Sequence, residues 1–152
     1  MSHNSEQEDH DLPVEGNSVS FSKTRREHST EIMEDYVEAI ADLIFESGEA
    51  RVVELSRRIG VTHVTVTRTI DRLEKAGYVI CPPYRAIFLT EKGNALARSC
   101  KERHQIVVAF LHSLGISEQT ANLDAEGIEH HVSTETLQAF KHHLALLHKV
   151  TL

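Results

Sequence analysis

Apolar residues recur at intervals of three and four along the stretch from about Arg25 to Ser47. They are Ile32, Tyr36, Val37, Ile40, Leu43 and Ile44. This spacing predicts an amphipathic helix with one apolar face, and Gly48 is placed to end it with a flexible cap. Residues 1–22 have few apolar positions and no helical period, so we expect a disordered, acidic tail there.

Two shorter periodic stretches follow, over residues 52–59 and 63–76, with a tight turn at Gly60 between them. This pattern predicts a helix, a turn and a second helix. Thr62 is placed to cap the second helix by accepting a backbone N–H hydrogen bond. The apolar residues on the buried face of that helix are Val66, Ile70 and Leu73. The β-branched residues of the stretch would also suit a strand, but their spacing favours a helix.

Beyond Gly77 the pattern changes to the alternation typical of strands. Residues 78–81 and 86–89 alternate around a Pro-Pro-Tyr-Arg turn, which predicts a β-hairpin. Three further helices are predicted, each with a hydroxyl residue at its start. They run from Thr90 to about Leu114, from Ser117 to about His131, and from Ser133 to about Lys149. The expected fold class is therefore mainly α with a small β-wing, built as a winged helix-turn-helix domain followed by a helical domain.

The composition favours a soluble, cytoplasmic protein. Of its 152 residues 40% are hydrophobic, which suits a globular core, and no apolar run reaches the length of about 18 residues that a membrane helix needs. The first residues are acidic, unlike a signal peptide. Cys81 and Cys100 form no CxxC pair, so reduced, structural thiols are expected.

The charge is unevenly distributed along the chain, although the net value is −7. Residues 1–50 carry 3 Lys/Arg against 13 Asp/Glu, whereas residues 51–103 carry 11 against 5, and residues 104–152 carry 2 against 5. The basic segment coincides with the predicted helix-turn-helix and hairpin. This arrangement is typical of a surface that faces phosphate, with acidic segments at either side that could hold cations.

A winged helix-turn-helix places one helix in the major groove of DNA and its hairpin beside the backbone. We therefore expect side chains of the second helix, with neighbouring arginines, to contact bases and phosphates. The candidate DNA-contacting residues are Arg57, Arg58, Thr62, His63, Thr65, Thr67, Arg68, Arg72 and Arg85. The structural alternative is a solvated basic face on a helical hairpin.

A candidate metal site lies in the acidic segments. On the predicted helix Glu126, Glu129 and His130 stand at i, i+3 and i+4, so two carboxylates and an imidazole are expected to converge on one point. His104, on the preceding helix, could complete this set. Carboxylate-rich ligands with few nitrogens suit manganese(II) better than zinc or copper.

Two further features bear on this site. Asp35 and Glu38 are three residues apart on the first long helix and share a face, although such pairs are usually solvated. Cys100 lies four residues before His104, which leaves open a soft ligand in the same place.

From about residue 28 onward the chain resembles the manganese-transport regulators of the diphtheria-toxin-repressor (DtxR) family. The stretches that carry the likeness are Met33 to Glu38, Glu54 to Gly77, Phe88 to Gly93, Arg103-His104 and Asp124 to His131. The resemblance implies a manganese(II)-dependent repressor that binds a palindromic operator as a homodimer. It implies a binuclear site, with two manganese ions per subunit, formed by Asp35, Glu38, His104, Glu126, Glu129 and His130.

The resemblance also favours manganese over iron as the ion. Iron-responsive relatives place a methionine at position 35 and a cysteine at position 129, whereas this chain has Asp35 and Glu129. The expected division is a tail over residues 1–22, a DNA-binding domain over 23–90 that contributes metal ligands from its first helix, and a metal-binding and dimerisation domain over 91–152. We expect the dimer interface on the apolar faces of residues 106–114 and 137–147.

Three other functions remain open at this level. The nearest is an iron-responsive repressor of the same fold. A carboxylate-bridged dimetal enzyme is the second, but the sequence shows no further nucleophile and no Gly-rich loop shaped for a substrate. A metal-independent winged-helix regulator is the third, in which the acidic cluster is only a solvated face. We expect no enzymatic activity.

Overall fold

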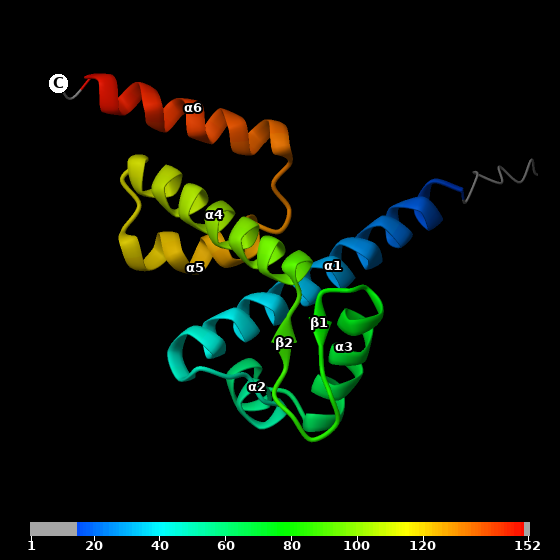
Figure 1. The fold of residues 1–152 in the computed structure, drawn as a ribbon. Coiled ribbons are helices and arrows are strands. Elements are labelled where there is room, and N and C mark those ends of the chain that lie inside the picture. Colours follow the sequence, from blue (N-terminus) through cyan, green and yellow to red (C-terminus); the bar gives the residue numbers. More distant parts are fainter. Residues whose placement is uncertain (1–14, 151–152) are drawn as a thin grey trace, which may run out of the picture.

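The computed structural model describes residues 15–150, which form six helices and two short strands (Figure 1). They are α1 (Glu15–Ser47), α2 (Val52–Ile59), α3 (His63–Lys75), β1 (Val79–Ile80), β2 (Phe88–Leu89), α4 (Glu91–Ser113), α5 (Glu118–Ile128) and α6 (Thr134–Val150). The predicted fold class, mainly α with a small β-wing, is confirmed. None of the helices in this part of the chain has the length and apolar character needed to cross a bilayer.

One hydrophobic core holds α1, α2, α3 and the hairpin together. Its buried residues include Tyr36, Val37, Ile40, Leu43, Ala50, Leu55, Val66, Ile70, Leu73, Val79, Ile87 and Ala97. The apolar face predicted for α1 is thus buried, as are the three predicted residues of α3. Thr62 caps α3 as expected, because its hydroxyl oxygen accepts from the backbone N–H of Thr65 at 3.2 Å.

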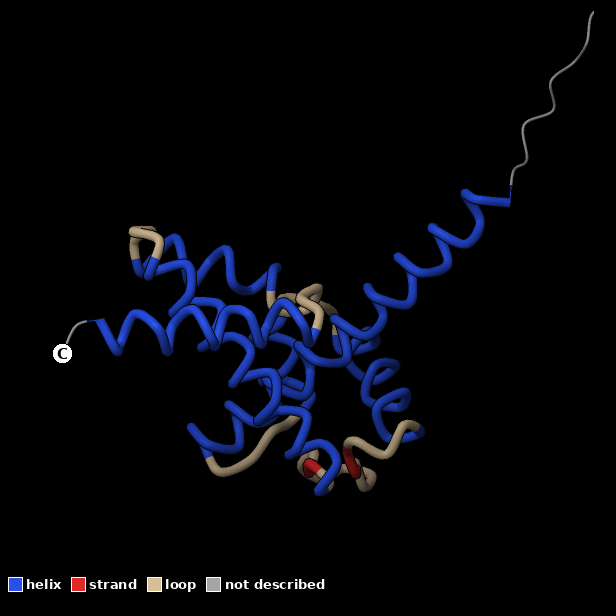
Figure 2. Tube along the Cα trace, turned by 90° about the horizontal axis from the view of Figure 1, so that it is seen from above, coloured by secondary structure: helices blue, strands red, loops and turns tan. Residues whose placement is uncertain are grey.

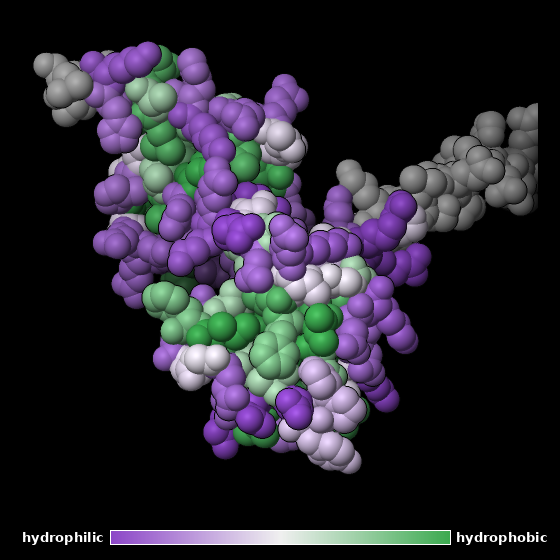
Figure 3. All heavy atoms as spheres, in the orientation of Figure 1, coloured by the Kyte–Doolittle hydropathy of each residue, from purple (hydrophilic) through white to green (hydrophobic). Residues whose placement is uncertain are grey.

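The hairpin is shorter than predicted. Two antiparallel pairs form its ladder, Val79 with Leu89 and Ile80 with Phe88. The expected strands of four residues are wrong because the two prolines that follow Cys81 have no N–H to donate, and the N–H of Cys81 bonds to the Glu74 carboxylate instead. Figure 3 shows apolar side chains gathered over the strands, where Ile80 and Phe88 are half exposed.

Helix α4 connects the two halves of the molecule, because it contacts α1, α5 and α6 (Figures 1 and 2). At its start Gly93 lies against the hairpin so closely that a Cβ there would stand 2.1 Å from the Tyr78 carbonyl oxygen. Further along, the rings of Phe110 and Phe140 stack with centroids 3.8 Å apart and tie α6 to α4.

Helix α1 begins at Glu15, well before the expected start near Arg25, so the predicted disordered tail is wrong for residues 15–22. Residues 1–14 of that predicted tail lie outside the described part. Apolar periodicity marks only a helix face that is buried, whereas this part of α1 extends away from the body of the molecule (Figure 2). A helix that is already nucleated propagates into polar sequence at small cost, so no apolar pattern marks its first turns.

Candidate metal centre and DNA interface

The six candidate ligands meet where α1, α4 and the end of α5 come together, and they fall into two groups. The first group is His104, Glu126 and Glu129, and the second is Asp35, Glu38 and His130. Within each group one ligand atom from every residue lies within 4.8 Å of the others. We call these six residues the metal centre.

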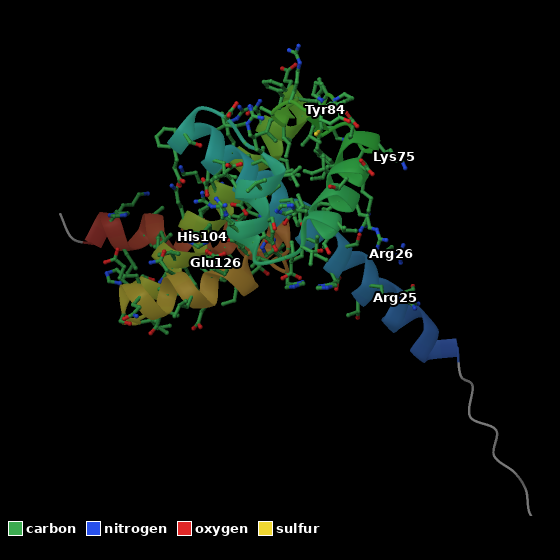
Figure 4. The ribbon with its side chains drawn as sticks, turned by 90° about the horizontal axis from the view of Figure 1, so that it is seen from below. Arg25, Arg26, Lys75, Tyr84, His104 and Glu126 are labelled. Carbon is green, nitrogen blue, oxygen red and sulfur yellow. The ribbon has the colours of Figure 1, made fainter. Side chains whose placement is uncertain are left out.

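In the first group the His104 Nδ1 atom lies 2.6 Å from Glu129 Oε2 and 3.6 Å from Glu126 Oε1. Figure 4 shows His104 and Glu126 coming from neighbouring helices. Glu129 is buried, whereas the Glu126 side chain is 70% exposed. An ion held here would therefore have solvent on the side of Glu126.

In the second group α1 supplies both carboxylates. The Nε2 atom of His130 lies 3.1 Å from Asp35 Oδ1 and 3.6 Å from Glu129 Oε1. The two oxygens of Glu129 therefore face different groups, one toward His104 and the other toward His130. A carboxylate in this position can bridge two ions.

The expectation that Glu126, Glu129 and His130 converge on a single point is wrong. Helix α5 ends at Ile128, about three residues before the predicted end, and residues 129–131 form a turn. The turn directs His130 toward α1 and leaves Glu126 facing α4. One sequence stretch therefore contributes to both groups.

The metal centre gathers more negative charge than its surroundings neutralise. Burial, together with the nearby carboxylate of Glu129, raises the pKa of Glu38 to about 7. Burial also raises the pKa of Glu129, against the lowering effect of His104. Carboxylates in this condition hold protons that a divalent cation can displace. Their oxygen-rich donor set, with two imidazoles and no sulfur, fits a hard to borderline ion such as manganese(II).

Sequence reasoning missed Glu34 and Arg103, which support the second group. Glu34 is buried, and its Oε2 lies 2.7 Å from His130 Nδ1 and 2.6 Å from an Arg103 guanidinium nitrogen. Burial alone would raise the pKa of Glu34, but the hydrogen bonds from His130 and Arg103 bring it below its usual value. The signal was present in the spacing, because Glu34 stands four residues before Glu38 and shares its face.

Cys100 belongs to neither ligand group. Its side chain is fully buried, and burial raises the pKa of the thiol to about 12. The thiolate needed for metal ligation is therefore disfavoured, and the soft ligand left open by the sequence has no support in the geometry.

The predicted DNA-facing residues of α3 lie on its exposed side. His63, Thr65, Thr67 and Arg68 are all exposed, and so are Arg57 on α2 and Arg85 in the hairpin turn. Thr67 donates its hydroxyl hydrogen to the His63 carbonyl oxygen at 2.9 Å. At the tip of the hairpin Tyr84 is fully exposed with a positive φ of 59°, and it projects from the molecule in Figure 4.

Two of the predicted phosphate contacts have partners inside the protein. Both terminal nitrogens of Arg58 lie 2.8 Å from the Glu46 carboxylate, which ties α2 to α1. An Arg72 guanidinium nitrogen donates to the Ser29 hydroxyl at 2.6 Å, which ties α3 to α1. The charges of Arg58 and Arg72 still add to the positive potential of the predicted DNA-facing surface, but each side chain also links two helices of the fold.

A winged helix-turn-helix joined to an acid- and histidine-lined centre defines the class of metal-responsive, DNA-binding regulators. Two family descriptions match the chain in this order. Residues 28–87 match the iron dependent repressor, N-terminal DNA binding domain, and residues 90–149 match the iron dependent repressor, metal binding and dimerisation domain.

Comparison with named relatives identifies the family more narrowly. A Salmonella typhimurium protein named transcriptional regulator MntR is 49% identical over 127 residues, covering 84% of this chain and 81% of the relative. A Bacillus subtilis protein named HTH-type transcriptional regulator MntR is 38% identical over 109 residues, covering 72% of this chain and 77% of the relative. The chain belongs to the MntR family of transcriptional regulators, which is not a family of enzymes.

Solved structures agree in fold. A structure named manganese-dependent transcriptional repressor complex with manganese is 27% identical with a TM-score of 0.67, covering 74% of this chain and 52% of that one. The IdeR structure from T. acidophilum is 25% identical with a TM-score of 0.65, covering 74% of this chain and 53% of that one. This chain therefore spans about half the length of these two solved structures.

Proposed function

We propose that the protein is a manganese(II)-dependent repressor that binds a palindromic operator as a homodimer and controls genes of manganese uptake or efflux. One observation carries the proposal. The metal centre takes two of its ligands, Asp35 and Glu38, from the helix whose apolar face packs on the DNA-reading unit, and the others from α4, α5 and the turn after α5. Residues 23–90 are then the DNA-binding domain, and residues 91–152 the metal-binding and dimerisation domain.

The donor set supports manganese(II) at two ions per subunit. Each of the two groups offers two carboxylates and one imidazole, and Glu129 lies between them with one oxygen toward each. Oxygen-rich sites with no sulfur ligand favour manganese over thiophilic ions. The relatives named MntR and the solved manganese-dependent repressor are in keeping with this ion.

The coupling follows from the charges of the residues themselves. In the metal-free protein the carboxylates of Glu38 and Glu129 repel each other across the contact between α1 and the turn after α5. Bound manganese supplies the positive charge that neutralises these side chains. Asp35 and Glu38 then hold α1, with the helix-turn-helix packed on it, at a fixed angle to the dimerisation domain. The two DNA-reading helices of a dimer, one α3 from each subunit, thereby lose less conformational freedom when they bind the two halves of a palindromic operator.

The test is a DNA-binding titration with purified protein and a labelled operator from a manganese-transport promoter. It is run with manganese(II), with iron(II) under anaerobic conditions, and with a chelator. We expect tight binding with manganese and a large loss of affinity in chelator. Equal affinity in all three conditions would exclude metal-dependent repression, and activation by iron alone would assign the site to iron.

A further inference from the structure

The amino-terminal half of α1, residues 15–30, meets the DNA-reading helix α3 at Ser29, and its first turns extend away from the body of the molecule (Figure 2). The contact that places it there is the hydrogen bond from the Arg72 guanidinium to the Ser29 hydroxyl, at 2.6 Å. Arg72 is exposed on α3, the helix predicted to enter the major groove. The first turns of α1 therefore continue outward from the edge of the predicted DNA interface.

The charges along α1 from Arg25 to Glu31 are separated by face. Arg25 and Arg26 stand four and three residues before Ser29, so both lie on the side of α1 that bears the Arg72 contact. Glu31 lies on the opposite side, where its carboxylate is 3.4 Å from the His131 ring and 3.6 Å from His28. Glu31 thus faces the turn after α5, whereas Arg25 and Arg26 lie on the side of α1 that carries the Arg72 contact.

Both arginines are available for a partner. They are exposed, and within the described residues 15–150 no carboxylate forms an ion pair with either. The Arg26 Nε atom donates only to the Ser22 carbonyl oxygen of its own helix, at 3.4 Å. Figure 4 shows Arg25 and Arg26 projecting from α1 while Lys75 projects from the end of α3, one turn beyond Arg72.

We propose that the amino-terminal half of α1 is a second DNA-binding element, in which Arg25 and Arg26 bind backbone phosphates beside the groove that α3 occupies. The inference rests on the proposed function. Charge complementarity selects DNA as the partner, because the arginines continue a cationic surface that already faces it at Arg68, Arg72 and Lys75. Since the contacts are to phosphate, they add affinity for any DNA sequence and give no base preference.

The test compares the salt dependence of DNA binding between wild-type protein and the variant Arg25→Ala/Arg26→Ala. Each phosphate contact contributes a slope of roughly 0.9 to the plot of log affinity against log salt concentration. We expect the double variant to reduce the slope by up to about 2 per subunit. The loss should be of similar size on the operator and on a scrambled duplex of the same length.

Two controls accompany this measurement. Arg25→Lys/Arg26→Lys keeps the charges and should retain most of the slope. Lys149→Ala removes a cation from the far end of α6, well away from α3 in Figure 1, and should leave it unchanged. Manganese stoichiometry and thermal unfolding of all three variants should match wild type, because the substituted side chains are exposed and lie outside the metal centre.

The outcomes separate the two proposals. If wild-type protein binds DNA without regard to manganese, the proposed function is contradicted. If wild type is manganese-dependent but the double alanine variant keeps its slope and affinity, the amino-terminal half of α1 does not contact DNA. Tighter DNA binding by the alanine variant also overturns the inference, because the arginines would then hold another acidic partner.

Discussion

The Nδ1 atom of His130 lies 2.7 Å from the Oε2 atom of Glu34, and this contact determines what the other ring nitrogen can do. An ionised carboxylate only accepts hydrogen bonds, so Nδ1 carries the proton that is shared with Glu34. The Nε2 atom then faces Asp35 at 3.1 Å, inside the second ligand group. We therefore propose that Glu34 positions the candidate ligand His130, with Arg103 holding Glu34 in place.

We predict that Glu34→Gln weakens manganese binding by about 10- to 100-fold, the usual effect of losing a partner that orients a metal-binding histidine. The measurement is calorimetric titration of the metal-free protein with manganese(II). Glu31→Gln is the matched control, since Glu31 also pairs with a histidine, His131, but not with a ligand. Equal manganese affinity in the two variants would show that Glu34 does not orient His130.

The metal-free protein should become less stable as pH rises from about 5 to 10. Hydrogen bonds that the His130 ring donates to the carboxylates of Asp35 and Glu34 raise the pKa of His130 to about 10 from 6.5, so its stabilising proton is fully present below pH 6.5 and lost toward pH 10. Burial raises the pKa of Glu38 to about 7 from 4.5, so the folded state binds more protons than the unfolded state between these values. Both groups act in the same direction.

Urea unfolding in chelator at a series of pH values measures this dependence. Saturating manganese(II) should weaken or reverse the trend, because protons then compete with the ion for the same side chains. A free energy of unfolding that rises with pH in chelator would contradict the placement of these two groups.

Glu129→Cys should shift activation of DNA binding from manganese toward iron(II) and other thiophilic ions. The substitution places a thiolate between the two ligand groups and removes the carboxylate whose oxygens face both. DNA-binding titrations with manganese(II), iron(II), cobalt(II) and zinc(II) under anaerobic reducing conditions test this, with metal content measured in parallel.

Glu126→Cys is the matched control for that substitution. Its side chain is exposed at the edge of the first group and belongs to that group alone, so one ion should still be held by the second group. We expect fewer ions per subunit in Glu129→Cys than in wild type. An unchanged order of metals and an unchanged ion count would show that Glu129 is not a ligand.

Arg68→Ala and Arg72→Ala should both weaken DNA binding and leave manganese stoichiometry intact, because neither residue belongs to the metal centre. They should differ in one respect. Arg72→Ala removes the hydrogen bond to Ser29 and should speed hydrogen exchange in the amino-terminal half of α1, whereas Arg68→Ala should not. Loss of manganese by either variant would contradict their assignment to the DNA interface.

Much of this architecture follows from local sequence. The apolar spacing of α1 and the hydroxyl cap at Thr62 act within a few residues, and both predictions are confirmed by the structure. Long-range partners are invisible to such reasoning. Glu34 meets His130 across 96 positions of the chain, and Arg72 meets Ser29 across 43, so their roles emerge only when the helices pack.

The turn after α5 illustrates the same limit within a single motif. Helical spacing places Glu126, Glu129 and His130 together, and the side chains do share one neighbourhood. Where the helix ends decides which of them share an ion, and that depends on tertiary contacts with α1. Sequence identified the ligand candidates, whereas packing divided them into two groups.

The central claim is that metal binding and DNA binding are coupled through the metal centre, and reciprocal titration tests it most directly. Manganese affinity is measured with and without a saturating operator duplex, and operator affinity with and without saturating manganese. Thermodynamic linkage requires the ratio of operator affinities to equal the product of the ratios of manganese affinities over all the ions that the dimer binds. We predict that operator DNA tightens manganese binding and that this equality holds. A manganese affinity that is unchanged by the operator would contradict the account.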